Sequence, residues 1–286
     1  MIRAALRILV PVALLALIWR HLDGAQALAY LAGADPGLIA LALVLLHVQI
    51  VAAALRWRVT AAQLGQELGR GQALAEYYLA VLANAVLPGG VLGDAGRAVR
   101  ARGAVGVRAS AQAVVIERLI GQILLFAVLV PGLLLLALPG RGAMLAGLAG
   151  AVLAAGAALR WGPAPVRAFG RALWRAWAPV WRTQLGLSAI ALAGLVGAFA
   201  ACSAAVGAPL SAGIAAVLVP LTLVAMLLPV SVGGWGLREG AAALLWPVAG
   251  YSAEAGVAAS MAFGLAALAA ALPGLVVPAR AGRAAP

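Results

Sequence analysis

Two short segments of this chain combine the residue types of a phosphate-binding turn. Residues 87–100 read LPGGVLGDAGRAVR, and residues 228–240 read LPVSVGGWGLREG. A proline ends a regular helix because it lacks an amide hydrogen, and glycines allow a tight turn and a close approach of a ligand to the backbone. A helix that restarts after such a turn directs free N–H groups and the positive end of its dipole toward it. The segments therefore predict two half-helices that bind an anion.

Each segment also supplies an arginine, which is a bidentate phosphate donor. We expect Arg97 and Arg238, with the amides near Gly93 and Gly236, to hold one phosphate together. A single motif of this kind favours a purely structural role, whereas two related motifs favour function, since ionisable groups are costly inside a bilayer. The predicted binding residues are Asn84, Pro88, Gly89, Gly93, Asp94, Arg97, Glu117, Arg118, Pro229, Gly233, Gly234, Gly236, Arg238 and Glu239.

The acidic residues in this set have alternative roles. Asp94 either caps its own helix or pairs with Arg97 when no ligand is bound. Glu239 either balances the charge of Arg238 or moves a proton, and Asp94 and Glu117 are further candidates for proton coupling. Glu117 and Arg118 lie near the start of another apolar run. Helical spacing leaves open whether they reach the site or lie at the membrane surface.

The elements that position these residues are apolar runs. The chain has 286 residues, of which 65% are hydrophobic and only 10% charged, which is far too few charges for a soluble domain. Several runs approach the roughly 20 residues that cross a bilayer as a helix. They cover about 4–19, 37–55, 73–87, 114–138, 143–159, 184–206, 212–228 and 257–277. Continuous Leu, Ala and Val, without strict alternation, excludes a membrane β-barrel. The composition predicts an all-α polytopic membrane protein.

The charges predict the topology. All basic residues are arginines, and the net charge is +12. They lie in short loops between apolar runs, so the positive-inside bias explains them and nucleic acid is not the expected partner. Loops 56–70 and 97–108 are both basic, so both are expected in the cytoplasm. The short run between them must then enter the membrane and return to the same side, and the run at 212–246 is interpreted in the same way.

The result is about six full spans plus two re-entrant broken-helix pairs. We expect one domain, built as an inverted repeat of halves at about 1–140 and 141–286, in the plasma (inner) membrane with both termini cytoplasmic. Breaks at corresponding places in two halves predict a mid-membrane binding site.

Residues 160–182 carry arginines and tryptophans but no acid. They form either an interfacial helix along an anionic leaflet or an ordinary cytoplasmic loop. An alternative takes residues 1–27 as a cleaved signal peptide, because residues 25–27 read AQA.

Four motifs of the chain resemble the lysylphosphatidylglycerol synthase transmembrane-region family, also called flippase-like domain proteins. They are LRWR at 55–58, NAVLPGGVLGDAGRAVRARG at 84–103, VVIERLIGQ at 114–122 and LPVSVGGWGLREG at 228–240. The resemblance implies a membrane domain that moves an aminoacylated phospholipid between leaflets. The soluble synthase domain of the best-known members is not in this sequence, so a stand-alone translocation module is expected. Other members are linked with polyprenyl-linked sugars, hopanoids or glycolipids.

We therefore expect a lipid translocase that works by alternating access and binds lipids with an anionic headgroup. The chain has no P-loop motif, so a lipid gradient, protons or a partner would supply the energy. A membrane enzyme acting on lipid phosphates would need a cluster of acids or histidines, and eight acids and two histidines are scattered here. Neither a cofactor nor a metal is expected. The other alternative is a non-catalytic subunit that anchors a lipid-synthesising or glycosyltransferase partner, docked at 160–182.

Overall fold

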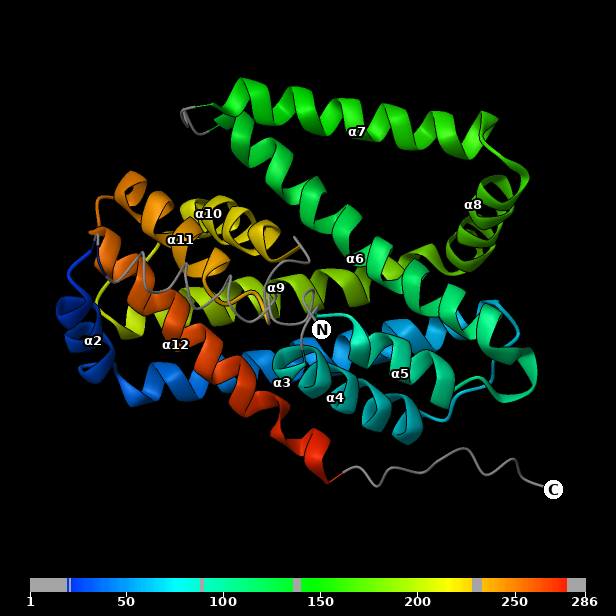
Figure 1. Cartoon of the computed structure of the whole chain (residues 1–286), viewed down its shortest axis with the longest axis horizontal. Helices are drawn as coiled ribbons and strands as arrows, with labels where there is room; N and C mark the ends of the chain where they lie inside the picture. The colour runs from blue at the N-terminus through cyan, green and yellow to red at the C-terminus, as the bar shows by residue number, and fades with distance from the viewer. Residues whose placement is uncertain (1–19, 21, 88–89, 136–139, 228–232, 277–286) are drawn as a thin grey trace.

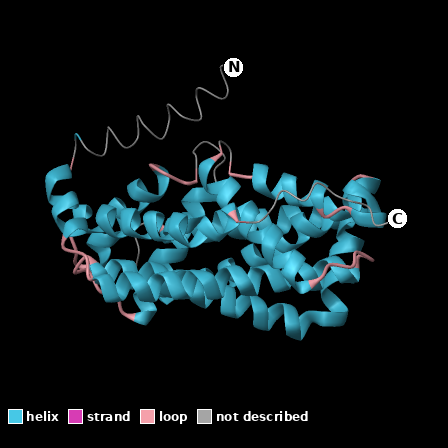
Figure 2. Cartoon of the chain, turned by 90° about the horizontal axis from the view of Figure 1, so that it is seen from below, coloured by secondary structure: helices cyan, strands magenta, loops and turns pink. Residues whose placement is uncertain are grey.

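The described part of the chain is helical. A computed structural model describes residues 20, 22–87, 90–135, 140–227 and 233–276. Figure 2 shows no strand in this part. The α-helices are α2 (Gly24–Ala32), α3 (Pro36–Gln63), α4 (Arg70–Val86), α5 (Leu92–Arg100), α6 (Gly106–Leu135), α7 (Arg141–Trp161), α8 (Ala164–Trp177), α9 (Trp181–Ala205), α10 (Ala212–Val224), α11 (Leu237–Leu245) and α12 (Ala253–Ala271). Short 3₁₀ segments are η1 (Gly103–Val105), η2 (Ala178–Val180), η3 (Ala225–Leu227), η4 (Trp246–Ala249) and η5 (Leu272–Leu275).

Five helical segments of the described residues are long and apolar enough to cross a bilayer. They are Pro36–Gln63, Gly103–Leu134, Arg141–Trp161, Ala164–Ala205 and Ala253–Leu275. Each of these segments overlaps one predicted span, and the predicted span at 4–19 lies outside the described residues. The all-α membrane fold is confirmed, while the total of six spans stays a prediction.

Helices α3 and α9 form the most extensive interface and lie side by side through the centre of the molecule (Figure 1). Small residues let the two backbones approach. A Cβ atom on Gly194 of α9 would lie 2.8 Å from the carbonyl oxygen of Leu45 on α3. Ala42 and Ala198 are fully buried nearby. Close packing through small residues is what holds membrane helices together where lipid tails remove the usual hydrophobic driving force.

The first predicted break is present. Helix α4 ends at Val86, Leu87 is extended, and Gly90 has φ +63°. Helix α5 then begins at Leu92 and packs back against α4. A Cβ atom on Gly93 would overlap the carbonyl group of Ala80, so only glycine allows this contact. Pro88 and Gly89 lie outside the described residues.

The second break separates α10 from α11. Gly233, Gly234 and Gly236 all have positive φ, between +57° and +84°, a region that L side chains rarely adopt. Pro229 lies outside the described residues. A Cβ atom on Gly233 would lie 2.9 Å from the carbonyl oxygen of Ala85, at the end of α4. The second break therefore meets the tip of the first half-helix.

The helices of the two halves have corresponding neighbours. Helix α5 packs on α6 as α11 packs on α12, and α6 contacts α10 as α12 contacts α4. The α3–α9 pair lies between the two sets (Figure 1). This pairing is what a repeat related by a two-fold axis requires, and the inverted topology itself stays a prediction.

Helix α7 stands apart from this body, whereas α8 contacts α3 and α6 (Figure 1). No residue of α7 is buried. Ala172 and Ala176 of α8 are buried and pack with Ile116 and Ile120 of α6. The segment at 160–182 is thus largely helical and attached to α6, and its contact with a lipid leaflet stays a prediction.

The contact at Gly93 makes the first broken pair sensitive to one methyl group. We expect Gly93→Ala to destabilise the fold by about 1–3 kcal/mol, because the added Cβ forces α5 away from α4. Gly147→Ala on α7 is the matched control, since nothing lies within 4 Å of its Cβ position. Thermal unfolding in detergent measures both, and equal melting temperatures for the two variants would contradict the close approach.

Candidate functional site

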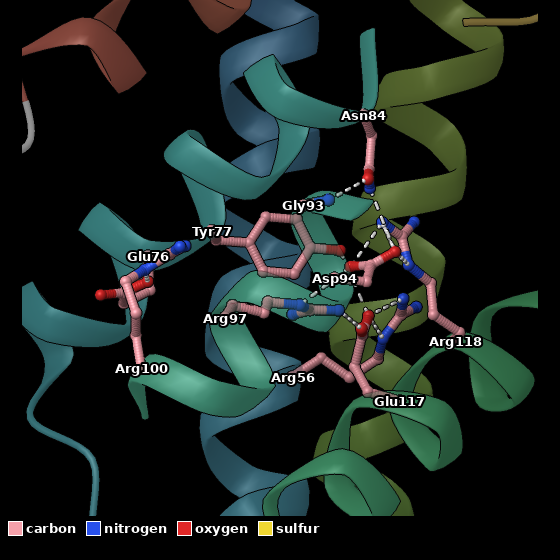
Figure 3. Close-up of polar contacts among 10 residues, drawn as sticks. All are labelled: Arg56, Glu76, Tyr77, Asn84, Gly93, Asp94, Arg97, Arg100, Glu117 and Arg118. Carbon is pink, nitrogen blue, oxygen red and sulfur yellow. Dashed lines mark hydrogen bonds and ion pairs between the residues drawn. The ribbon is translucent and has the colours of Figure 1, made fainter. Parts of the chain in front are cut away.

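Arg97 lies at the centre of a buried polar cluster. It comes from α5, and its side chain is fully buried. Its Nε donates to Asp94 Oδ1 at 2.9 Å, and its Nη2 donates to Glu117 Oε2 at 2.8 Å (Figure 3). The guanidinium carbon lies 4.7 Å from the ring centroid of Trp57 and 4.5 Å from that of Tyr77. Two aromatic faces and two carboxylates therefore hold this cation inside the protein.

Glu117 accepts hydrogen bonds from residues of three helices, α3, α4 and α5. Arg56 of α3 approaches it with both Nε (3.2 Å) and Nη2 (2.6 Å) on Oε1, and Arg97 binds the other oxygen. Tyr77 donates to Oε1 at 3.3 Å, and Arg56 Nη1 donates to Ser188 Oγ at 3.1 Å. The sequence left open whether Glu117 reaches the site, and the structure places it fully buried within the cluster.

Sequence analysis missed Arg56, Tyr77 and Ser188. Arg56 ends an apolar run, so the positive-inside bias accounted for it completely. One signal was available, because LRWR at 55–58 was among the recognised motifs. Room for the guanidinium comes from α6, where a Cβ atom on Gly121 would lie 2.8 Å from Arg56 Nη2.

Asp94 joins the cluster to the first break. Besides Arg97, it accepts hydrogen bonds from Arg118 Nε at 3.1 Å and Nη2 at 3.0 Å. Asn84 Nδ2 donates to Asp94 at 3.1 Å, and Asn84 Oδ1 accepts from the amide of Gly93 at 2.8 Å. Of the two predicted roles of Asp94, the structure shows the ion pair with Arg97. The amide of Gly93, expected to bind the ligand, has the Asn84 side chain as its acceptor.

The charges of this cluster do not balance. Arg56, Arg97 and Arg118 face only Asp94 and Glu117, which leaves one positive charge in excess. Nη1 of Arg97 is buried with no hydrogen-bond partner among the described residues. A buried guanidinium without a complete set of acceptors is costly, so the cluster favours one further anion.

A groove of about 420 Å³ opens beside the excess charge. It runs between α5 and α6 and is lined by apolar side chains such as Val91, Val115 and Leu119. Asp94, Arg118 and Gln122 also line it, and 43% of the Arg118 side chain is exposed. Arg118 is thus the most exposed arginine of the cluster, and Asp94 occupies its fork in the described conformation.

The cluster lies toward the C-terminal end of α3. Arg56 is 20 residues along α3 from Pro36, which at 1.5 Å per residue is about 30 Å, a length equal to the thickness of the hydrocarbon layer. The basic residues predicted to form a loop at 56–70 begin inside this helix, which continues to Gln63.

A second cluster surrounds Arg238 on α11. Its Nη2 donates to Glu239 Oε1 at 2.7 Å, and its Nε donates to Ser260 Oγ at 2.8 Å. Trp235 and Phe263 lie against the guanidinium at 5.0 and 5.4 Å. One arginine faces one carboxylate here, so this cluster is neutral. Glu239 balances Arg238, one of its two predicted roles.

The structure does not bring Arg97 and Arg238 around one anion. Each guanidinium is bound by acids of its own half, and the amide of Gly236 donates to Glu239 Oε2 at 2.6 Å. The described conformation shows each arginine with a carboxylate of its own half, and the shared phosphate stays a prediction. Neither spacing nor motif fixes which carboxylate a buried arginine takes. Among the described residues, no group of His, Cys, Asp or Glu is arranged as metal ligands would be.

The thermal stability of the protein tests the structural role of the ion pair between Arg238 and Glu239. We expect Arg238→Gln to destabilise the protein by about 3–5 kcal/mol, because the fully buried Glu239 carboxylate loses its counter-ion. The double variant Arg238→Gln/Glu239→Gln removes both charges and should recover much of the loss. Thermal unfolding in detergent tests this, and a wild-type melting temperature for Arg238→Gln would overturn the structural role of this arginine.

Comparison with known proteins identifies the same family that the sequence motifs resemble. The family model described as lysylphosphatidylglycerol synthase TM region matches residues 4–274, nearly the whole chain. No curated protein and no solved structure matches the chain. Together with five apolar helices of membrane-spanning length in the described part, the match indicates an integral membrane protein with a lipid-related function. The chain belongs to the lysylphosphatidylglycerol synthase transmembrane-region family.

Proposed function

We propose that this protein is a translocase that moves a phosphate-bearing lipid between leaflets by alternating access. The lipid is a phospholipid, a glycolipid or a polyprenyl-linked compound. One observation carries the proposal: a buried cluster with one positive charge in excess lies at the end of an apolar groove. Such a groove accepts a hydrocarbon chain, and the cluster accepts the phosphate to which the chain is attached.

The phosphate first reaches Arg118. This guanidinium is partly exposed in the groove, and its fork matches two phosphate oxygens. Asp94 occupies the fork in the described conformation, with both of its oxygens on Arg118. A phosphate that displaces Asp94 from Arg118 would also come within reach of Arg97, whose Nη1 lacks a partner. Asp94 thus occupies the phosphate site between transport cycles and keeps Arg97 and Arg118 in position.

The broken helices supply the movement. The tip of α4 meets the second break at Ala85 and Gly233, and each broken pair packs against a long helix of its own half. Rocking of one half against the other about the α3–α9 interface would open the cluster to either leaflet in turn. Asp94, Glu117 and Glu239 remain the candidates for proton coupling, alongside a lipid gradient or a partner as the source of energy.

Arg118 gives the most direct test. We expect Arg118→Gln to slow the translocation of fluorescent phosphatidylglycerol about 10- to 100-fold, which corresponds to the loss of a charge-assisted bidentate contact. The fold should persist, since Asp94 keeps Arg97 and Asn84 as donors. Proteoliposomes with a nitrobenzoxadiazole-labelled lipid, quenched by dithionite, measure the rate.

Arg108→Gln is the matched control, because Arg108 is an exposed residue of the same helix. A labelled glycolipid without phosphate is the matched substrate, and its movement should not depend on Arg118. Equal rates for Arg118→Gln and Arg108→Gln, or inactivity of the wild type toward both phosphatidylglycerol and a polyprenyl phosphate, would refute the proposal.

We further propose that the protein is not an enzyme. Its buried acids act as counter-ions, and Asp23 and Asp35 cap helices by accepting the amide hydrogens of Gln26 and Leu38. The alternative is a non-catalytic subunit for a lipid-synthesising or glycosyltransferase partner. The exposed Trp174, 70% accessible on α8, favours that alternative.

Affinity purification in mild detergent separates the two functions. We expect the translocase to retain anionic lipid and no stoichiometric protein, because its charged cluster is completed by a phosphate. Mass spectrometry of the eluate measures both components. A stoichiometric synthase or glycosyltransferase without bound lipid would support the subunit function instead.

A further inference from the structure

A second groove, of about 760 Å³, lies between α7 and α8. Arg160, Arg167, Arg171, Arg175 and Trp174 line it. We propose that this groove binds the headgroup of a resident anionic lipid that carries two phosphates, at a site separate from the translocation pathway.

The arginines of α8 form one stripe. Arg167, Arg171 and Arg175 are spaced at i, i+4 and i+8, so they lie on the same helix face. Like charges at this spacing destabilise a helix. Arg160, at the end of α7, lines the same groove and brings a fourth positive charge. An anion outside the chain would remove this repulsion.

No acid of this protein can neutralise the stripe locally. The sequence has no Asp or Glu between Glu117 and Glu239. Arg167 Nη1 donates to the carbonyl oxygen of Gly162 at 3.3 Å, and none of the four arginines forms an ion pair with a carboxylate of the described residues. All four are exposed. Their guanidinium groups are therefore available to an external ligand.

The surroundings point to a lipid rather than a soluble anion. Helix α7 is an apolar helix of membrane-spanning length with no buried residue, so one wall of the groove belongs to a lipid-facing helix. Trp161 is 76% exposed and Trp174 is 70% exposed, and tryptophan concentrates at the level of lipid headgroups. Basic pockets of this kind bind lipid headgroups with more than one phosphate.

The stripe has a fixed orientation. Ala172 and Ala176, on a neighbouring face of α8, are buried against Ile116 and Ile120 of α6. The arginine face is therefore held toward α7 by packing. Each planar guanidinium offers two parallel donors, so four of them match the oxygens of two phosphates better than those of one.

Lipid binding in nanodiscs tests this site. The probe is diphosphatidylglycerol in a phosphatidylcholine background, and native mass spectrometry of the protein released from the discs measures bound lipid. We expect Arg167→Gln/Arg171→Gln/Arg175→Gln to weaken binding of the probe about 100-fold, since each arginine near an anionic headgroup contributes about fivefold. Arg171→Gln alone should weaken it by about fivefold.

The matched control is Arg70→Gln/Arg102→Gln/Arg108→Gln, which removes the same charge from exposed arginines elsewhere. This control should bind the probe as the wild type does. Equal weakening by both triple variants would show diffuse attraction to the membrane and overturn the site.

Two other outcomes would also overturn the proposal. Displacement of the probe by millimolar inorganic pyrophosphate would identify a soluble anion as the ligand. Co-purification of an acidic protein in place of lipid would identify a protein partner. Arg118→Gln, which tests translocation, should keep the bound lipid, so the two proposals fail separately.

Discussion

The buried carboxylate of Glu117 holds the first half of this protein together. It binds Arg56 of α3 through one oxygen and Arg97 of α5 through the other, while its own backbone belongs to α6. Removing these charges from water is costly, and only their mutual attraction and complete hydrogen bonding offset the cost. The position of α5, a helix of only nine residues, depends on this interaction. So does the excess charge beside the groove, since a third arginine shares the two carboxylates.

The two halves use one spacing for different purposes. Glu117 and Gly121 on α6 are four residues apart, as are Ser260 and Gly264 on α12. In each pair the first residue binds the arginine of the neighbouring half-helix, and the glycine leaves room for a guanidinium. In the first half, the residue on the long helix is the carboxylate Glu117. In the second half, the corresponding residue is Ser260, and the carboxylate that pairs with Arg238 is its sequence neighbour Glu239. The second cluster is therefore neutral and closed, and the first is positive and borders a groove.

The arginines of this chain serve in three settings. Some are buried counter-ions, some lie in the short loops that orient the protein in the membrane, and those of α8 line a groove with no acid near it. A guanidinium stays charged in each of these environments and presents the same planar fork. In the two grooves this fork lies beside apolar helices, a combination that suits a phosphate attached to a hydrocarbon chain.

Local patterns of the sequence determined the helical membrane fold and the two breaks, because apolar runs, prolines and glycines act on the backbone where they stand. They also identified Asp94, Arg97, Glu117 and Arg118, since ionisable residues inside apolar runs are rare and costly. Only the tertiary structure decided which charges meet. Arg56 lies 61 residues from Glu117 and 132 from Ser188. Periodicity fixes the face of a helix on which a side chain lies, but the partner across that face depends on how distant helices pack. Arg97 and Arg238 lie in separate clusters, of which the first keeps one positive charge in excess and the second is neutral.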